Sequence, residues 1–103
     1  MNHYPDKADQ ELIQSFATLK SETEIKSFLR DLLTIQELKE AAKRFQIAKS
    51  LWISDKTYKE IATQFHTSTT TVTRVSSWLK RKKYGGYRTA LTRLYPKIPK
   101  RPD

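Results

Sequence analysis

The stretch from Thr57 to Leu79, TYKEIATQFHTSTTTVTRVSSWL, constrains the fold of this chain most strongly. Apolar residues recur there at helical spacing in two short blocks. The first block consists of Ile61, Ala62 and Phe65, and the second consists of Val72, Val75 and Leu79. His66, Thr67 and Ser68 fill the short turn between the two predicted helices. The pattern predicts two short helices whose apolar faces pack together, the arrangement of a helix-turn-helix.

The residues from Thr67 to Val75 are rich in β-branched side chains, and propensity alone would favour a strand there. The apolar positions do not alternate, however, and a helical period fits them better. We therefore predict a helix. His66 occupies the turn position where this motif normally has glycine, so we expect a left-handed backbone at this residue. Histidine is among the non-glycine residues enriched in that conformation.

The exposed face of the second predicted helix would carry short hydroxyl groups and one guanidinium. Its residues are Thr69, Thr70, Thr71, Thr73 and Arg74. Such groups suit hydrogen bonds to base edges and phosphates, which favours double-stranded DNA as the partner. Two alternatives stay open: a threonine-rich face can be merely solvated, and helix-turn-helix geometry also occurs in proteins that do not bind DNA.

Positive charge is concentrated in the part of the chain that holds this motif. The net charge is +9, but residues 1–40 carry five Lys/Arg and eight Asp/Glu, a net charge of −3. Residues 41–103 carry fifteen Lys/Arg and three Asp/Glu, a net charge of +12. This asymmetry indicates a polyanionic partner, with an acidic membrane surface as the weaker alternative. The run Arg81, Lys82 and Lys83 directly follows the second predicted helix, which favours phosphate contacts over a merely solvated helix end.

Residues that could carry out catalysis or hold a metal are scarce. The chain has no cysteine, which excludes a disulfide framework and a thiolate metal site. His3 and His66 are the only histidines, and no nucleophilic triad, metal-ligand spacing or phosphate loop appears. We interpret the pair Gly85–Gly86 as a helix stop rather than a phosphate cradle. We therefore expect no enzymatic activity, no metal and no cofactor.

The chain also lacks the sequence features of a membrane or secreted protein. No apolar run approaches the roughly 20 residues of a membrane span. The first ten residues, MNHYPDKADQ, are too polar for a secretion signal. We expect a cytoplasmic, nucleoid-associated protein with no membrane partner.

The remaining sequence predicts helices throughout, so the fold class is all-α. Asp6 can cap a helix over residues 7–20, and a short helix is expected over residues 87–95. Three further residue pairs have capping-box spacing and mark helix starts: Ser21 with Glu24, Thr34 with Glu37, and Thr57 with Glu60. The longest predicted helix covers residues 35–53. Its inward face is expected to consist of Leu38, Ala41, Ala42, Phe45, Ala48 and Leu51.

We predict a single helical DNA-binding domain over residues 1–95. Within it, residues 7–53 are expected to form a dimerisation core, and residues 57–83 the helix-turn-helix with its basic extension. Residues 96–103 form a basic, proline-rich tail, in which Pro96, Pro99 and Pro102 exclude a helix.

The first two predicted helices lack core partners within one chain, and their apolar stripes would stay partly exposed. The wide apolar faces that favour a dimer are built from Leu12, Phe16, Phe28, Leu32 and Phe45. A homodimer sharing the core 7–53 would cover these stripes. Two-fold symmetry would then place the two second helices of the motif about 34 Å apart, one turn of DNA.

The segment from Leu32 to Leu79 resembles the Trp repressor family. The matching residues are LLT at 32–34, Arg44, EIA at 60–62, TTVTR at 70–74, and Leu79. The continuation through YGGY at 84–87 and TAL at 89–91 looks more like the YerC/YecD-type branch of that superfamily, which consists of small bacterial proteins. The resemblance implies a Trp-repressor-like helical bundle, an intertwined homodimer that represses transcription by occupying operator DNA.

The resemblance also implies functional residues. In tryptophan-responsive members, L-tryptophan lies between two arginines with a threonine nearby, and Arg44, Arg74 and Thr34 match these positions. Val75 and Trp78 replace small residues of those members and add bulk where the ligand would lie. We therefore expect no L-tryptophan co-repressor, and interpret Arg44 and Arg74 as surface or phosphate-contacting arginines.

Carried over from the family, the DNA-binding residues begin with Tyr58 and Lys59 at the start of the motif's first helix. Thr69, Thr70, Thr71 and Thr73 enter the major groove, and Lys80 lies further along the second helix. The sequence thus favours a dimeric bacterial DNA-binding transcriptional regulator, a repressor. One alternative is the DNA-targeting module of a transposase or recombinase, although these 103 residues hold no acidic catalytic domain. The other is a helical module that binds RNA or an acidic protein.

Overall fold

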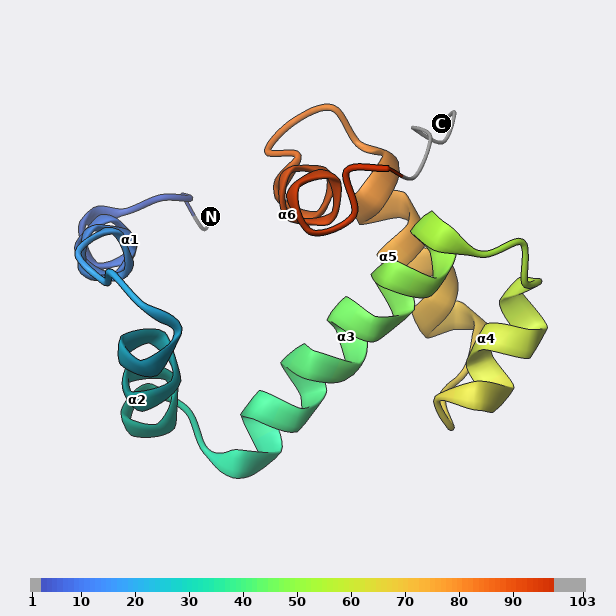
Figure 1. The fold of residues 1–103 in the computed structure, drawn as a ribbon, viewed down its shortest axis with the longest axis horizontal. Coiled ribbons are helices and arrows are strands. Elements are labelled where there is room, and N and C mark those ends of the chain that lie inside the picture. The colour runs from blue at the N-terminus through green and yellow to red at the C-terminus, as the bar shows by residue number, and fades with distance from the viewer. Residues whose placement is uncertain (1–2, 98–103) are drawn as a thin grey trace. The chain divides into compact units, whose positions relative to one another are not determined.

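The computed structural model describes residues 3–97, and this part of the chain forms six α-helices and no strand (Figure 1). The helices are α1 (Lys7–Ala17), α2 (Glu22–Leu32), α3 (Ile35–Ile53), α4 (Tyr58–Gln64), α5 (Thr69–Lys80) and α6 (Gly86–Leu94). The predicted all-α class is confirmed. Of the predicted tail 96–103, only Pro96 and Lys97 lie within the described residues, where they form a turn.

The chain divides into two compact units, Met1–Leu38 and Lys39–Asp103. The boundary falls inside α3 and therefore inside the predicted dimerisation core 7–53. The first unit contains α1, α2 and the first turn of α3. The second contains the rest of α3 and the helices α4 to α6, which include the whole helix-turn-helix.

Helix α1 starts as predicted but ends earlier. The Asp6 carboxylate accepts a hydrogen bond from the Asp9 N–H (2.8 Å), and the Asp9 carboxylate accepts one from the Asp6 N–H (3.0 Å). This reciprocal cap satisfies two backbone donors that the first turn leaves unpaired. The helix ends at Ala17 rather than at residue 20, because the hydroxyl of Thr18 donates to the Ser15 carbonyl (2.7 Å) and closes the last turn.

The linker after α1 explains why the second predicted cap is incomplete. Ser21 does cap α2, since its hydroxyl accepts from the Glu24 N–H (3.1 Å). The Glu24 carboxylate, however, accepts from the N–H of Lys20 (2.7 Å) rather than from that of Ser21. Lys20 therefore lies outside both helices, and its backbone is hydrogen-bonded to the first turn of α2.

The unit 1–38 keeps much of its apolar surface exposed. The rings of Phe16 on α1 and Phe28 on α2 meet edge to face, with centroids 5.1 Å apart and an interplanar angle of 81°. No residue of α1 or α2 is buried, however. Leu12 is 40% exposed, Ile25 39% and Leu32 40%. A single chain thus leaves these apolar side chains partly in water.

The buried side of α3 differs from the predicted one. Of the six residues expected to face inward, only Ala48 is buried, whereas Ala42 is exposed and Phe45 and Leu51 lie at the margin of the core. Ile47 and Trp52 are buried instead. The helix packs against α4 and α5 through these side chains and against α6 through Phe45, whose ring lies 6.5 Å from that of Tyr87. Because α3 makes contacts on two sides, its buried face differs from the apolar stripe that the sequence predicts.

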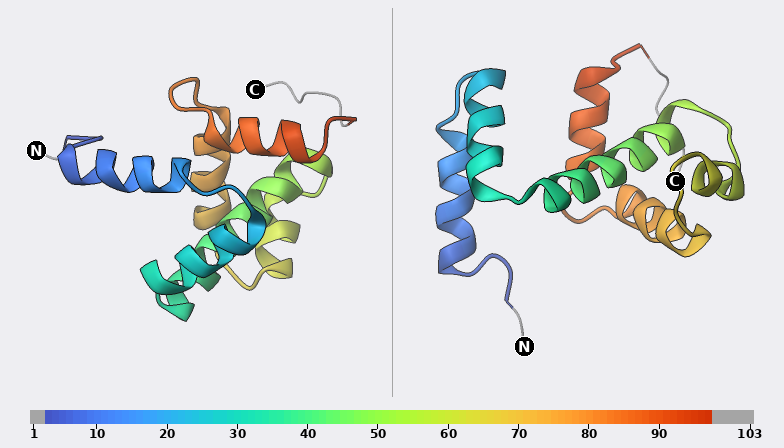
Figure 2. Two further views of the ribbon diagram at one scale, coloured as in Figure 1. Left: turned by 60° about the vertical axis from the view of Figure 1, so that its left-hand side comes forward. Right: turned by 90° about the horizontal axis from the view of Figure 1, so that it is seen from below.

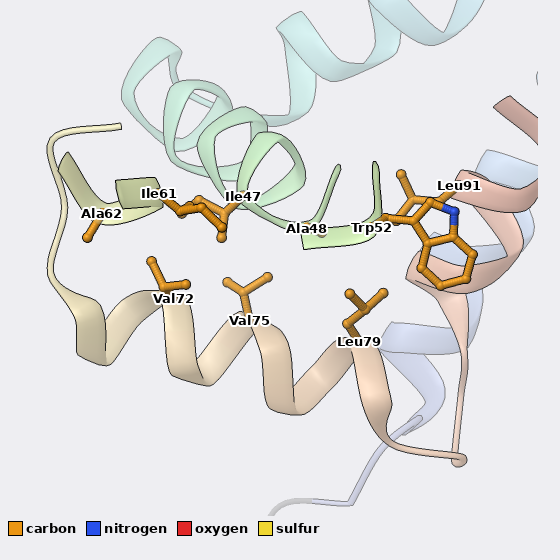
Figure 3. Close-up of a cluster of buried hydrophobic side chains, with 9 residues drawn as sticks. All are labelled: Ile47, Ala48, Trp52, Ile61, Ala62, Val72, Val75, Leu79 and Leu91. Atoms are coloured by element: carbon orange, nitrogen blue, oxygen red, sulfur yellow. The ribbon is translucent and has the colours of Figure 1, made fainter. Parts of the chain in front are cut away.

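The core of the second unit gathers nine buried side chains from four helices (Figure 3). They are Ile47, Ala48 and Trp52 of α3, Ile61 and Ala62 of α4, Val72, Val75 and Leu79 of α5, and Leu91 of α6. Val72, Val75 and Leu79 all lie on one side of α5 and point toward the other three helices (Figure 3). This packing leaves the opposite side of α5 in solvent.

The connection between α5 and α6 corrects the interpretation of the glycine pair as a helix stop. Helix α5 already ends at Lys80, and Gly85, with φ +67°, is the N-cap of α6. Arg88 on α6 closes the end of α5, because its Nε donates to the Leu79 carbonyl (3.0 Å) and its Nη2 to the Lys80 carbonyl (3.2 Å). These carbonyls at the end of α5 lack an intrahelical partner, so Arg88 supplies one. Helix α6 is shifted by one residue from the predicted range 87–95.

Candidate nucleic-acid interface

Helix α4 begins with the predicted capping box. The Thr57 N–H donates to the Glu60 carboxylate (2.8 Å), and the Glu60 N–H donates to the Thr57 hydroxyl (3.1 Å). The bond from the Thr57 backbone is the main cause of a lowered pKa for the Glu60 carboxyl. A carboxylate in the first turn also interacts favourably with the positive end of the helix dipole. Thr34 and Glu37 make the same pair of bonds at the start of α3 (2.9 and 3.1 Å).

The turn between α4 and α5 has the left-handed residue that was predicted. His66 has φ +54°. The N–H of His66 donates to the Thr63 carbonyl (3.3 Å), and the N–H of Thr67 donates to the Ala62 carbonyl (2.9 Å). This pair of bonds is the Schellman motif, which normally has glycine at the left-handed position. The motif ends α4 at Gln64, and α5 starts at Thr69 after a turn of four residues, so that the two helices cross (Figure 2).

Helix α5 presents a polar stripe to solvent. Its N-cap is Ser68, whose hydroxyl accepts from the Thr71 N–H (3.1 Å). We name the surface along the stripe the outer groove, a shallow depression of about 440 Å³. It is lined by Thr69, Thr70, Thr73, Arg74, Ser77 and Trp78, and all of these except the half-buried Trp78 are exposed. Three of the four predicted threonines therefore lie together with Arg74, where a nucleic acid can reach them.

Thr71 is separated from the other three threonines. Its side chain is half-buried, and its hydroxyl lies 3.1 Å from that of Ser68. It lines a second, more enclosed depression of about 200 Å³ between α3 and α5, which we name the inner cleft. The residues of the inner cleft are Glu40, Lys43, Arg44, Ile47, Thr67, Thr71, Arg74, Val75 and Trp78.

The inner cleft brings together two of the three residues that the resemblance assigned to a ligand. Arg44 and Arg74 both line it, whereas Thr34 belongs to the unit 1–38 and does not. The two bulky residues noted in the sequence, Val75 and Trp78, line it as well. Its volume is below the roughly 300–1,000 Å³ of typical small-molecule sites.

The start of α4 contributes one lysine and one buried hydroxyl. Lys59 is exposed and lines a shallow groove with Lys56, whose Nζ donates to Gln64 Oε1 (2.7 Å). Tyr58, which the resemblance assigned to DNA contact, is half-buried, and its hydroxyl lies 2.5 Å from that of Ser76 on α5. The polar end of Tyr58 is thus engaged inside the protein.

The basic run continues beyond the end of α5. Lys80 is the last helical residue, and Arg81 to Lys83 form an exposed loop. The Arg81 guanidinium lies 5.1 Å from the centroid of the Tyr84 ring, and the Lys83 ammonium lies 5.2 Å from it. Cations at this distance interact favourably with an aromatic face. The tyrosine therefore holds two cations of the loop close to the end of α5.

Two residues of the interface were not identified from the sequence. Ser77 lies on the outer groove, four residues after Thr73 and seven after Thr70, so helical spacing could have revealed it. Arg88 closes the end of α5 from another helix, and nothing in the sequence indicates that contact. Within residues 3–97, no helix is long and apolar enough to cross a membrane, and no three acidic or histidine side chains converge on a metal position.

The arrangement of these helices corresponds to a known family. The family model described as Trp repressor protein matches residues 7–95. The chain belongs to the Trp repressor family. A solved structure, described as a TrpR-like protein from Eubacterium eligens ATCC 27750, is 34% identical with a TM-score of 0.70. The match covers 87% of this chain and 91% of that one. No curated protein matches the chain.

Membership of the Trp repressor family confirms the predicted superfamily and fold. It also gives the general class of function, DNA-binding regulation. The outer groove is therefore the candidate surface for contact with DNA. Placement in the YerC/YecD-type branch stays a prediction.

Proposed function

We propose that this member of the Trp repressor family is a sequence-specific transcriptional regulator that represses by occupying operator DNA as a homodimer. It would act on the bacterial chromosome in the cytoplasm. The observation that carries the proposal is the position of the outer groove. The stripe of Thr69, Thr70, Thr73, Arg74 and Ser77 lies on the side of α5 opposite its buried residues.

The core supports this role because it fixes the orientation of α5. Val72 and Val75 are fully buried, so α5 cannot rotate about its axis without opening the core. The outward stripe is thereby held ready for the major groove, where the N-terminal residues of a recognition helix contact base edges. Lys59, Lys80 and the loop 81–83 are exposed and would contact phosphates, which position the protein without selecting a sequence.

Homodimerisation is proposed from the apolar surface of residues 1–38. Leu12, Ile13, Phe16, Ile25 and Leu32 are all exposed by more than a third. A second copy that covers them removes this apolar area from water, at about 25 cal/mol for each Å² buried. It also supplies the second recognition helix that a two-fold symmetric operator requires.

We further propose that L-tryptophan is not required. The side chains of Val75 and Trp78 line the inner cleft together with Arg44 and Arg74. An effector shifts a conformational equilibrium only if it prefers one conformation. A cleft too small for the ligand offers no such preference.

The test is selection of bound sequences from random duplex DNA, with and without L-tryptophan. We expect one enriched two-fold symmetric site whose half-sites lie about one helical turn apart, recovered equally in both arms. An excess of structured RNA serves as competitor and separates this function from RNA binding. Recovery of no enriched site, or displacement by RNA but not by unrelated DNA, would contradict the proposal.

A further inference from the structure

The outer groove offers few kinds of chemical group to a base edge. Helix α5 has the sequence TTTVTRVSSWLK, which contains no Asn, Gln, Asp or Glu. The exposed lining consists of three threonines, one serine and Arg74. The groove therefore lacks the amides that pair with adenine and the carboxylates that accept from cytosine.

Hydroxyl groups do not distinguish one base from another in the way that amides and carboxylates do. A hydroxyl both donates and accepts, so it can bond to the edge of any base pair. The methyl group of threonine is different, because thymine alone presents a methyl group in the major groove. Apolar contact between the two methyl groups favours thymine. Arg74 is the other selective group of the lining, and a guanidinium suits guanine.

Thr70 and Thr73 are the threonines placed for such a contact. They lie three residues apart on the exposed stripe, on one face of α5. The buried Val72 between them holds that face outward. Thr71, in contrast, is half-buried and faces the inner cleft.

We propose that Thr70 and Thr73 recognise thymine through its C5 methyl group, so that the DNA site of this protein has thymines at the positions facing them. The proposal rests on the DNA-binding function proposed above and adds the base and the atom that are recognised. Uracil differs from thymine only by the missing methyl group. Burial of one methyl group gives about a fourfold preference for thymine over uracil at each such position.

The experiment replaces each thymine of the selected duplex site by uracil, one at a time, and measures the dissociation constant by fluorescence anisotropy. Wild-type protein should bind about fourfold more weakly when uracil replaces a thymine facing Thr70 or Thr73, and equally well when it replaces any other thymine. Thr73→Ser removes the threonine methyl and keeps the hydroxyl. It should weaken binding to the thymine site and abolish the thymine–uracil difference at a single position of each half-site. Thr70→Ser should do the same at a different position.

Two matched controls separate the methyl group from other effects. Thr73→Val keeps a methyl group and removes the hydroxyl, so the thymine–uracil ratio should persist even if overall affinity falls. Ser77→Ala changes the same stripe without removing a methyl group of threonine, so its ratio at every thymine should match that of wild type. Equal affinity of wild type for the thymine and uracil sites would overturn the methyl proposal while leaving sequence-specific binding in place. A thymine–uracil affinity ratio that neither serine substitution changes would also overturn the methyl proposal and leave sequence-specific binding in place. Absence of any enriched duplex site would overturn both proposals.

Discussion

The hydroxyl of Tyr58 lies 2.5 Å from the hydroxyl of Ser76, and this hydrogen bond joins the first residue of α4 to the buried side of α5. Ser76 is 3% exposed, whereas Tyr58 is half-buried. The two helices of the motif thus share a polar contact in addition to their apolar packing. The contact fixes how α4 and its exposed Lys59 sit against the recognition helix.

The first prediction concerns the unequal burial of these two hydroxyls. Tyr58→Phe leaves the buried Ser76 hydroxyl without its partner and should lower the free energy of unfolding by about 1–3 kcal/mol. Ser76→Ala leaves a tyrosine that can reach water and should cost about 0.5–1.5 kcal/mol. Urea unfolding of both variants and of the double variant measures these values. Because the pair shares one bond, the double variant should be destabilised by less than the sum of the two single substitutions. Strict additivity would show that the hydroxyls do not interact.

The second prediction concerns the loop that follows α5. If about six to ten phosphates are contacted per dimer, affinity should fall by about 10³–10⁵-fold between about 50 and 200 mM salt. Lys82→Ala and Lys83→Ala should weaken binding to all sequences alike, and removing each phosphate-binding lysine should reduce the salt slope by about one. Thr73→Ala should leave the salt slope unchanged and reduce the preference for the selected site. Anisotropy titrations over a salt series on selected and scrambled duplexes provide the measurement. If the lysine substitutions alter the preference for the selected site and Thr73→Ala reduces the salt slope, the assigned roles are reversed.

The third prediction follows from the left-handed backbone of His66, φ +54°. His66→Gly removes the Cβ that is unfavourable there and should be neutral or mildly stabilising, because glycine also loses more entropy on folding. His66→Val places a β-branched side chain in this conformation and should destabilise by about 1–2 kcal/mol or more. Thermal unfolding followed by circular dichroism compares the variants. Equal melting temperatures would show that the solution structure of the turn differs.

The fourth prediction is the oligomeric state. Light scattering at micromolar concentration should give twice the 12.1 kDa of one chain. Replacing the exposed Leu12 or Ile25 with Asp should shift the protein toward the monomer, because a charge buried at an apolar interface is costly. Asp at the exposed Thr63 of α4, outside the unit 1–38, is the matched control and should leave the mass unchanged. A monomeric wild type would remove the two-half-site model.

The fifth prediction is that L-tryptophan does not bind. Calorimetry with millimolar L-tryptophan should show no heat beyond dilution, and operator affinity should not change. Trp78→Ser removes the indole that lines the inner cleft together with Arg44 and Arg74, and so enlarges the cleft. The same calorimetry on this variant is compared with that on the wild type. If the wild type takes up tryptophan saturably and then binds its operator more tightly, crowding by Val75 and Trp78 is not the deciding factor.

The sequence determined the local features of this protein because they depend on neighbours along the chain. Apolar spacing placed the two helices of the motif, and the cap pairs of Thr34 and Thr57 marked helix starts. The position of His66 in the turn predicted its left-handed backbone. The order and spacing of short motifs were enough to indicate the Trp repressor family, and the charge difference between the two parts of the chain indicated a polyanionic partner.

Tertiary structure alone decided which side chains face which partner. The buried face of α3 was misjudged because α3 packs on two sides, and a single apolar stripe cannot describe two contacts. Thr71 looks equivalent to Thr73 in the sequence, yet the packing of α5 against α3 turns it into the inner cleft. Tyr58 reaches Ser76 across 18 positions of the chain, and Arg88 reaches the end of α5 from α6. Such contacts arise only when distant segments are brought together, so no spacing rule along the chain contains them.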